Sequence, residues 1–167
     1  MPFIRRFSLL LFSAVILLSG CEQASNDWSS REDIVATDAD DPEMNIAIAK
    51  ARETLPQFWE ALSEENKEDH SFNIKVGLPA DNGGVEHIWV DSVSKKGSVM
   101  TGILINVPMH LSRFKLGDSI SFSTSQVTDW QYFHNGKSEG NHVTKVLLQR
   151  MPSEKANEIR EILGWNE

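Results

Sequence analysis

The spacing of apolar residues changes near residue 70 of this chain. Apolar residues first recur every three or four positions, at Met44, Ala47, Ile48, Ala51 and Leu55, which is the spacing of an amphipathic helix. They then recur at every second position, at Phe72, Ile74, Val76 and Leu78, as in a strand with one buried face. Helical and strand segments that follow one another in this way favour an α+β fold.

Local signals place the start of the first helix. Asp41 supplies an N-cap carboxylate, Pro42 fits the first turn, and Glu43 lies near the positive end of the helix. Pro56 is expected to interrupt the helix, because proline lacks an amide hydrogen. Thr54 and Gln57 would then form a capping box for a second helical stretch.

The remainder of the chain is rich in strand signals, with turns predicted at Ser94-Lys95-Lys96-Gly97 and at Asn135-Gly136. Strands are predicted over residues 72–78, 85–90, 99–106, 120–122 and 130–134, with Val143 to Leu148 as a last strand. Segment 99–106 is expected to be central, because it is largely apolar on both faces. Residues 108–117 should form an irregular crossing or a short helix. A final helix begins at Pro152 and Ser153 and ends near Gly164. The prediction is α+β: a mostly antiparallel sheet of about five strands, with N-terminal and C-terminal helices packed on it.

The first twenty residues have the three parts of an export signal. Arg5 and Arg6 precede an apolar stretch from Phe7 to Leu18, which is too short to span a bilayer. Leu18-Ser19-Gly20-Cys21 resembles the lipobox of bacterial lipoproteins, and this resemblance makes Cys21 the lipid-modified first residue of the mature chain. The expected organisation is a signal peptide over 1–20, the lipidated cysteine and a flexible acidic tether over 21–41, and a single α+β domain over 42–167.

Charge and cysteine content restrict the partners and the compartment. Cys21 is the only cysteine, so no intrachain disulfide can form. The mature chain keeps 14 of the 16 basic residues and all 24 acidic ones, a formal charge of −10, which disfavours nucleic-acid binding. Glu22 follows the cysteine, where lipoproteins kept at the inner membrane commonly carry aspartate. We therefore expect a lipid-anchored envelope protein at the outer membrane, facing the periplasm.

Four titratable residues are candidates for catalysis: His87, Asp91, Asp129 and His134. If the strands over 85–90 and 130–134 were neighbours, His87 and His134 could share a face with Asp91 or Asp129 and support acid–base chemistry. The alternative is that the histidines of the chain are separate surface and sheet-edge residues. No metal-ligand spacing such as His-Glu-x-x-His occurs among His70, His87, His110, His134 and His142, so neither a metal nor a cofactor is predicted.

Aromatic residues alternate along the strand predicted at 130–134. Trp130, Tyr132 and His134 would point to one face, and with Lys137 they could form an exposed strip that binds a protein or a glycan. The other interpretation makes Trp130 a core anchor and Asp129 a carboxylate that caps a turn.

Several segments together resemble a known family. They are Met44–Ala51, Phe58-Trp59, His87–Val90, Asn106-Val107-Pro108, Val127–Tyr132, Asn135–Lys137 and Gly140. Over roughly residues 42 to 150 the chain looks like the YegJ-like family of bacterial proteins of uncharacterised function. That resemblance implies no reaction and no catalytic residues. A more distant similarity to small immunity proteins of bacterial toxin systems is conceivable.

The leading hypothesis is therefore a lipid-anchored binding or accessory module that faces the periplasm, with an immunity-type inhibitor as one version. It would attach to the membrane through the lipid on Cys21 and bind an unidentified protein or glycan. The alternative is a small envelope hydrolase that uses His87, Asp91, Asp129 or His134.

Overall fold

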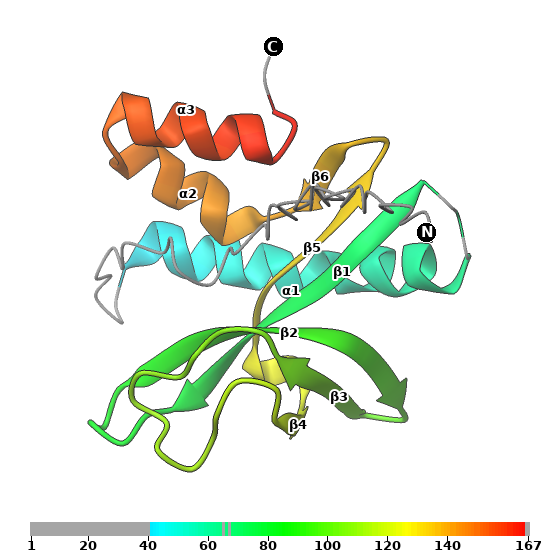
Figure 1. Cartoon of the computed structure of the whole chain (residues 1–167), viewed down its shortest axis with the longest axis vertical. Coiled ribbons are helices and arrows are strands. Elements are labelled where there is room, and N and C mark those ends of the chain that lie inside the picture. The colour runs from blue at the N-terminus through cyan, green and yellow to red at the C-terminus, as the bar shows by residue number, and fades with distance from the viewer. Residues whose placement is uncertain (1–40, 65, 67, 166–167) are drawn as a thin grey trace, which may run out of the picture.

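The computed structural model describes residues 41–64, 66 and 68–165, and these form one antiparallel sheet with helices packed against it (Figure 1). The sheet has the strand order β4-β3-β2-β1-β5-β6. Its strands are β1 (Asp69–Pro79), β2 (Val85–Lys96), β3 (Val99–Leu104), β4 (Ser119–Phe122), β5 (Val127–His134) and β6 (Lys137–Gly140). The α+β class and the antiparallel pairing are thus confirmed, with six strands instead of about five.

Helix α1 (Pro42–Ser63) is one continuous element of 22 residues. Its N-terminus is capped as predicted, because the Asp41 carboxylate accepts hydrogen bonds from the amides of Glu43 and Met44. The expected interruption at Pro56 is wrong. Leu55 and Phe58, on either side of the proline, are both buried in the core, and this packing holds the helix together across the missing amide.

The main core lies between α1 and the concave side of the sheet. It includes Ala51, Leu55 and Phe58 of α1, together with alternate residues of the strands such as Ile74, Val76, Ile88, Val90 and Trp130. Phe58 packs edge-on against Trp59, Phe72 and Trp130. Each large side chain that is fully buried here contributes about 1.5–3 kcal/mol, so the amphipathic stripe seen in the sequence is what fixes α1 on the sheet.

The segment predicted as a last strand is helical. Residues His142–Arg150 form α2, which contributes Val143 to a small second cluster with Met44 and Ala47 of α1. The cap residue Asn141 has a left-handed backbone and its side chain does not cap the helix. The spacing of Val143, Val146 and Leu147, which pack in this cluster, is the helical signal that the strand prediction missed. Helix α3 (Ser153–Ile162) follows as predicted, and Gly164 ends it with φ +69°.

Strand β3 is not a central strand buried on both faces. Its residues alternate, with Met100 and Leu104 buried and Val99 and Ile103 exposed, and it lies next to the edge strand β4. Strand β2 continues through the predicted turn at 94–97 as far as Lys96, with a bulge between Asp91 and Ser94. The outer face of this half of the sheet remains open to solvent, because the helices cover the opposite side (Figure 1).

The last strand, β6, was not predicted. It pairs with β5 across the predicted turn at Asn135 and Gly136, both with positive φ. A β-carbon at Gly140, where φ is +80°, would lie 2.2 Å from the carbonyl oxygen of Trp130, so only glycine fits at the end of β6. The short helix η2 (Thr124–Gln126) connects β4 to β5.

Candidate functional site

Asp129 lies on β5 with its side chain fully buried. Its Oδ1 accepts hydrogen bonds from the amides of Trp130 at 3.0 Å and His142 at 2.9 Å. Its Oδ2 accepts from the amides of Val143 at 2.9 Å and Thr144 at 3.4 Å. The carboxylate therefore caps the N-terminus of α2 from a neighbouring strand and satisfies amides that a helix leaves unpaired.

The electrostatic setting of Asp129 reflects this burial. Burial raises the pKa of the carboxyl to about 6, while the amide hydrogen bonds and the positive charge of Lys75 oppose the shift. Lys75 is opposite Asp129 in the β1–β5 pairing, is itself buried, and has its ammonium 5.1 Å from the ring centre of Trp89. The side chain of Asp129 has no exposed surface. Its carboxylate therefore holds the start of α2 and presents no oxygen to a substrate.

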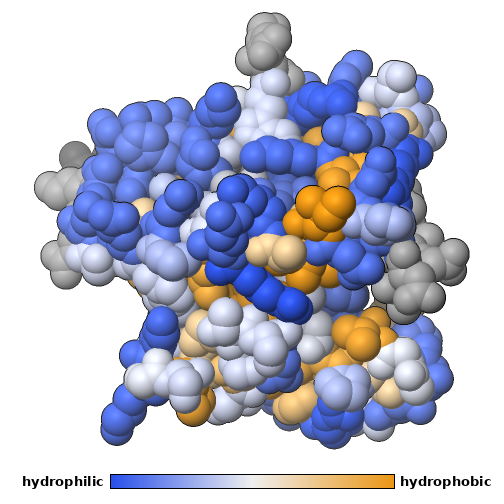
Figure 2. All heavy atoms as spheres, turned by 180° about the vertical axis from the view of Figure 1, so that it is seen from behind, coloured by the Kyte–Doolittle hydropathy of each residue, from blue (hydrophilic) through white to orange (hydrophobic). Residues whose placement is uncertain are grey.

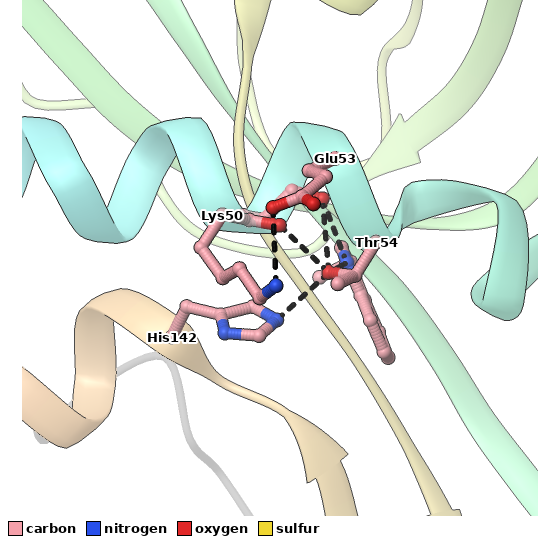
Figure 3. Close-up of polar contacts among 6 residues, drawn as sticks. Lys50, Glu53, Thr54 and His142 are labelled. Atoms are coloured by element: carbon pink, nitrogen blue, oxygen red, sulfur yellow. Dashed lines mark hydrogen bonds and ion pairs between the residues drawn. The ribbon is translucent and has the colours of Figure 1, made fainter.

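A second polar cluster joins α1 to α2 (Figure 3). The hydroxyl of Thr54 donates to the carbonyl oxygen of Lys50 at 2.8 Å and lies 2.9 Å from Nε2 of His142. The indole N–H of Trp130 donates to the carbonyl oxygen of Ala51 at 2.9 Å. Burial is the main cause that lowers the pKa of His142. Thr54 thus bonds within α1 and to α2, and does not start a second helix with Gln57.

His134 lies at the far end of β5, in an ion pair. Its Nδ1 is 2.5 Å from Oδ1 of Asp69, whose side chain is almost fully buried, and Nδ2 of Asn135 lies 2.9 Å from its Nε2. The hydrogen bond to Asp69 is the main cause that raises the pKa of His134. The imidazole therefore ties the start of β1 to the end of β5.

His87 and Asp91 lie on β2, on the same outer face of the sheet. The ring Nδ1 of His87 is 3.1 Å from the hydroxyl of Thr128 on β5, and it reaches over Gly77 of the intervening strand β1. A β-carbon at Gly77 would lie 3.3 Å from the Thr128 methyl group. Glycine at this position therefore leaves room for the contact between His87 and Thr128. Since β1 separates β2 from β5, the condition under which His87 and His134 would meet is not fulfilled.

The four candidate catalytic residues are thus distributed over three environments. His87 and Asp91 lie on the outer face, Asp129 lies under α2, and His134 lies at the opposite end of β1. Within the described part of the chain, no group of three or more His, Cys, Asp or Glu side chains could hold a metal ion. A catalytic role for any of the four stays a prediction.

The aromatic strip is only partly exposed. Trp130 is buried in the core, whereas Tyr132 is partly exposed and stacks between Phe72, at 5.0 Å, and Trp130, at 6.0 Å. Lys137 is exposed on β6 and pairs with His134 across the hairpin. The surface available at this hairpin therefore consists of Tyr132, His134 and Lys137, without Trp130.

Three carboxylates hold the backbone of the loop over residues 105–117. Glu86 accepts from the amides of Met109 at 2.8 Å and His110 at 2.7 Å. Asp81 accepts from the amide of Ser112 at 2.6 Å, and Asp118 from that of Lys115 at 2.9 Å. Leu111 anchors the loop in the core. The segment is an irregular crossing, which is one of the two predicted forms. Its backbone is held by these hydrogen bonds and by the buried Leu111.

This loop exposes apolar side chains. Val107 is 64% exposed, Met109 63% and Leu116 53%, and Val85, next to Glu86, is 60% exposed. Figure 2 shows that hydrophilic residues cover most of the upper part of the back of the molecule, while apolar residues reach the surface in its middle and lower parts. Pro108, which interrupts the alternation of side chains from Ile105 to Leu111, is the sequence signal of this loop.

Two features bear on membrane attachment. Cys21 and the predicted signal peptide and tether lie outside the described residues. Among the residues that the structure describes, no helix is both long enough and apolar enough to cross a bilayer.

Comparisons with known proteins agree with the resemblance noted in the sequence. The model of a family described as an uncharacterised protein conserved in bacteria (DUF2314) matches residues 41–166. The uncharacterised protein YegJ of Escherichia coli K12 is 27% identical over 117 residues, which cover 70% of this chain and 74% of YegJ. A putative ankyrin repeat protein of Neisseria meningitidis serogroup B is 29% identical over 127 residues, which cover 72% of this chain and 50% of that protein. No solved structure matches the chain.

Proposed function

Because the chain belongs to the DUF2314 family of uncharacterised bacterial proteins, for which no activity can be carried over, we propose a function from its own residues. We propose that it is a lipid-anchored binding protein of the bacterial envelope, held through Cys21 and facing the periplasm from the outer membrane. Its partner is a protein or a glycan.

The observation that carries the proposal is the sequence Leu18-Ser19-Gly20-Cys21 after a short apolar stretch and two arginines. Acylation of a cysteine at this position would anchor the chain without a membrane-spanning helix. One acyl chain binds a membrane reversibly, and two or three hold it stably. The start of α1 at Pro42 leaves 20 residues between Cys21 and the helix, which is room for a tether.

The placement of the polar residues supports binding over catalysis. Asp129 and His134, the candidates with shifted pKa values, are each held in contacts that join structural elements. The β5–β6 hairpin, by contrast, carries Tyr132, His134 and Lys137 at a surface that a partner can reach. A partly exposed aromatic on the same hairpin as an exposed cation suits recognition of a protein or a glycan.

The anchor is tested by following acylation. Cells that express the full chain are fed a labelled fatty acid, and the mature protein is analysed by mass spectrometry. We expect acyl chains on Cys21 in the wild type and in the control Ser25→Ala, and none in Cys21→Ser. A mature protein that starts before residue 21, or an unmodified Cys21, would contradict the proposal.

The binding surface is tested with a pair of charge reversals. Lys137→Glu changes the hairpin, and Lys96→Glu changes the exposed β2–β3 turn and serves as the control. In binding to envelope extracts, we expect Lys137→Glu to weaken saturable capture of a defined protein or glycan and Lys96→Glu to leave it unchanged. Equal binding by both variants would exclude the hairpin. Turnover of an envelope substrate that is lost in His87→Ala without loss of stability would favour the hydrolase.

A further inference from the structure

Several connections between strands lie at one end of the sheet, together with the 105–117 loop. Strand β1 ends there at Pro79, paired with Val85, the first residue of β2. Strand β3 leaves the sheet there at Leu104, and β4 enters at Ser119. The β1–β2 turn and the loop are joined by a hydrogen bond of 2.7 Å from the amide of Asp81 to the carbonyl oxygen of His110.

The first turn of α1 faces the same side of the molecule. Phe58, late in α1, packs on Phe72 near the start of β1, whereas Arg52, earlier in α1, donates to Val127, which pairs with Val76 further along β1. Helix α1 therefore runs opposite to β1, and its N-terminus points to the end at which β1 stops. In Figure 1 the first turn of α1 and the 105–117 loop both lie on the left.

The apolar surface of this loop is rigid and lies among basic side chains. Residues 105–117 include His110, Arg113 and Lys115 and no acidic residue. The acidic side chains next to the loop, Asp81, Glu86 and Asp118, turn toward its backbone amides, and Asp81 also lies 3.7 Å from Arg113. These three carboxylates thus accept hydrogen bonds from the loop backbone, while several apolar side chains and the basic side chains of the loop are exposed to solvent.

We propose that the exposed side chains of the loop, Val107, Met109 and Leu116, together with Val85, insert into the surface of a lipid bilayer. Apolar side chains bordered by cations fit the boundary between acyl chains and anionic headgroups. The inference rests on the proposed anchor, which would hold the molecule at a membrane by a tether that joins α1 at the end of the molecule where the loop lies. The β5–β6 hairpin, at the other end of β1, then faces away from the bilayer.

The lipid alone leaves the orientation open. Twenty residues can extend by up to about 70 Å at 3.3–3.6 Å per residue, so a tethered molecule could present any face to the membrane. Contact through the loop would select one orientation and keep the hairpin accessible to a partner.

The experiment uses the absence of other cysteines. The mature lipidated chain carrying Met109→Cys is labelled with an environment-sensitive fluorophore and reconstituted into phosphatidylcholine vesicles that contain one part in four of phosphatidylglycerol. The matched control is Val99→Cys, at the start of β3 and at the opposite end of the sheet, where the side chain is 51% exposed in the wild type. We expect blue-shifted emission, quenched by spin-labelled lipid, at position 109 and not at position 99. Identical emission at the two positions would overturn the proposal.

A second measurement separates the loop from the anchor. With Cys21→Ser, the mature chain has no acylation site, and its affinity for the same vesicles depends on the loop alone. Val107→Glu with Met109→Glu should lower that affinity by about tenfold or more, and Val99→Glu should leave it unchanged. If mass spectrometry shows no lipid on Cys21 while this difference persists, the anchor fails and the loop contact stands. A shift at position 109 that requires an added envelope protein would make the loop a protein-docking surface and overturn the proposal.

Discussion

Asp129 and Asp81 both hold backbone amides with their carboxylates, but in opposite environments. Asp129 is buried beneath α2, and burial raises the pKa of its carboxyl to about 6. Asp81 lies in solvent at the loop, and the hydrogen bond from the Ser112 amide lowers the pKa of its carboxyl. The same kind of hydrogen bond therefore accompanies opposite pKa shifts, because desolvation outweighs the hydrogen bonds only at the buried site.

The largest expected effect comes from removing the buried carboxylate. Asp129→Ala leaves the first amides of α2 and the charge of Lys75 without this partner in a buried site, which should cost about 3–5 kcal/mol in the free energy of unfolding. Denaturant unfolding measures this cost. Asp91→Ala, on the outer face, is the control and should cost about 0.5 kcal/mol or less. Equal losses in the two variants would show that the buried cap is no more important than a surface carboxylate.

Two apolar residues of the 105–117 loop, two positions apart, should contribute very differently to the free energy of unfolding. Leu111 is 2% exposed and Met109 is 63% exposed. We expect Leu111→Ala to lower the free energy of unfolding by about 2–4 kcal/mol and Met109→Ala to change it by less than about 0.5 kcal/mol. Thermal and denaturant unfolding of the two variants provide the measurement. A large loss in Met109→Ala would mean that this side chain packs in the fold and is not presented to solvent.

The two carboxylates should respond to pH with opposite signs. The folded state binds the Asp129 proton more tightly than the unfolded state, so the contribution of that carboxyl to stability is present below pH 3.8 and is lost as the pH rises through about 6. A shift of this size corresponds to about 2–3 kcal/mol. We therefore expect the stability of the wild type, relative to Asp129→Asn, to fall between pH 4 and 7.

For Asp81, whose folded pKa is lowered, the contribution is present above the ordinary pKa and is lost on acidification. The stability of the wild type relative to Asp81→Asn should therefore fall as the pH drops below about 4. If both stability differences changed in the same direction with pH, the contrast between the buried and the exposed carboxylate would be wrong.

Local sequence signals predicted the elements whose causes are local. The Asp41 cap, the alternation from Phe72 to Leu78 and the Asn135–Gly136 turn each depend on a few adjacent residues, and each is present in the structure. The exposed Ser153 start of α3 was likewise predicted. These elements establish the fold class without information on distant contacts.

The sequence-based predictions failed where contacts between residues distant in the sequence determine the secondary structure. Residues 143–148 were predicted as a strand, yet they lie in α2, where Asp129 accepts hydrogen bonds from the first amides and Val143 packs on α1. Pro56 should end a helix, yet core packing on both sides carries α1 past it. For the candidate site, Asp129 was singled out, but its task as a cap for α2 required knowledge of the register that places it beside residue 142.

The cap that Asp129 supplies to α2 also has a consequence for the order in which the elements fold. Helix α2 has nine residues, fewer than an isolated helix needs to be stable in water, and its own N-cap residue makes no side-chain cap. Its start is supplied by β5, 13 positions earlier, so α2 can become stable only after the β5–β6 hairpin has brought the chain back beside that strand. The hairpin thus acts as the template on which the C-terminal part of the molecule folds.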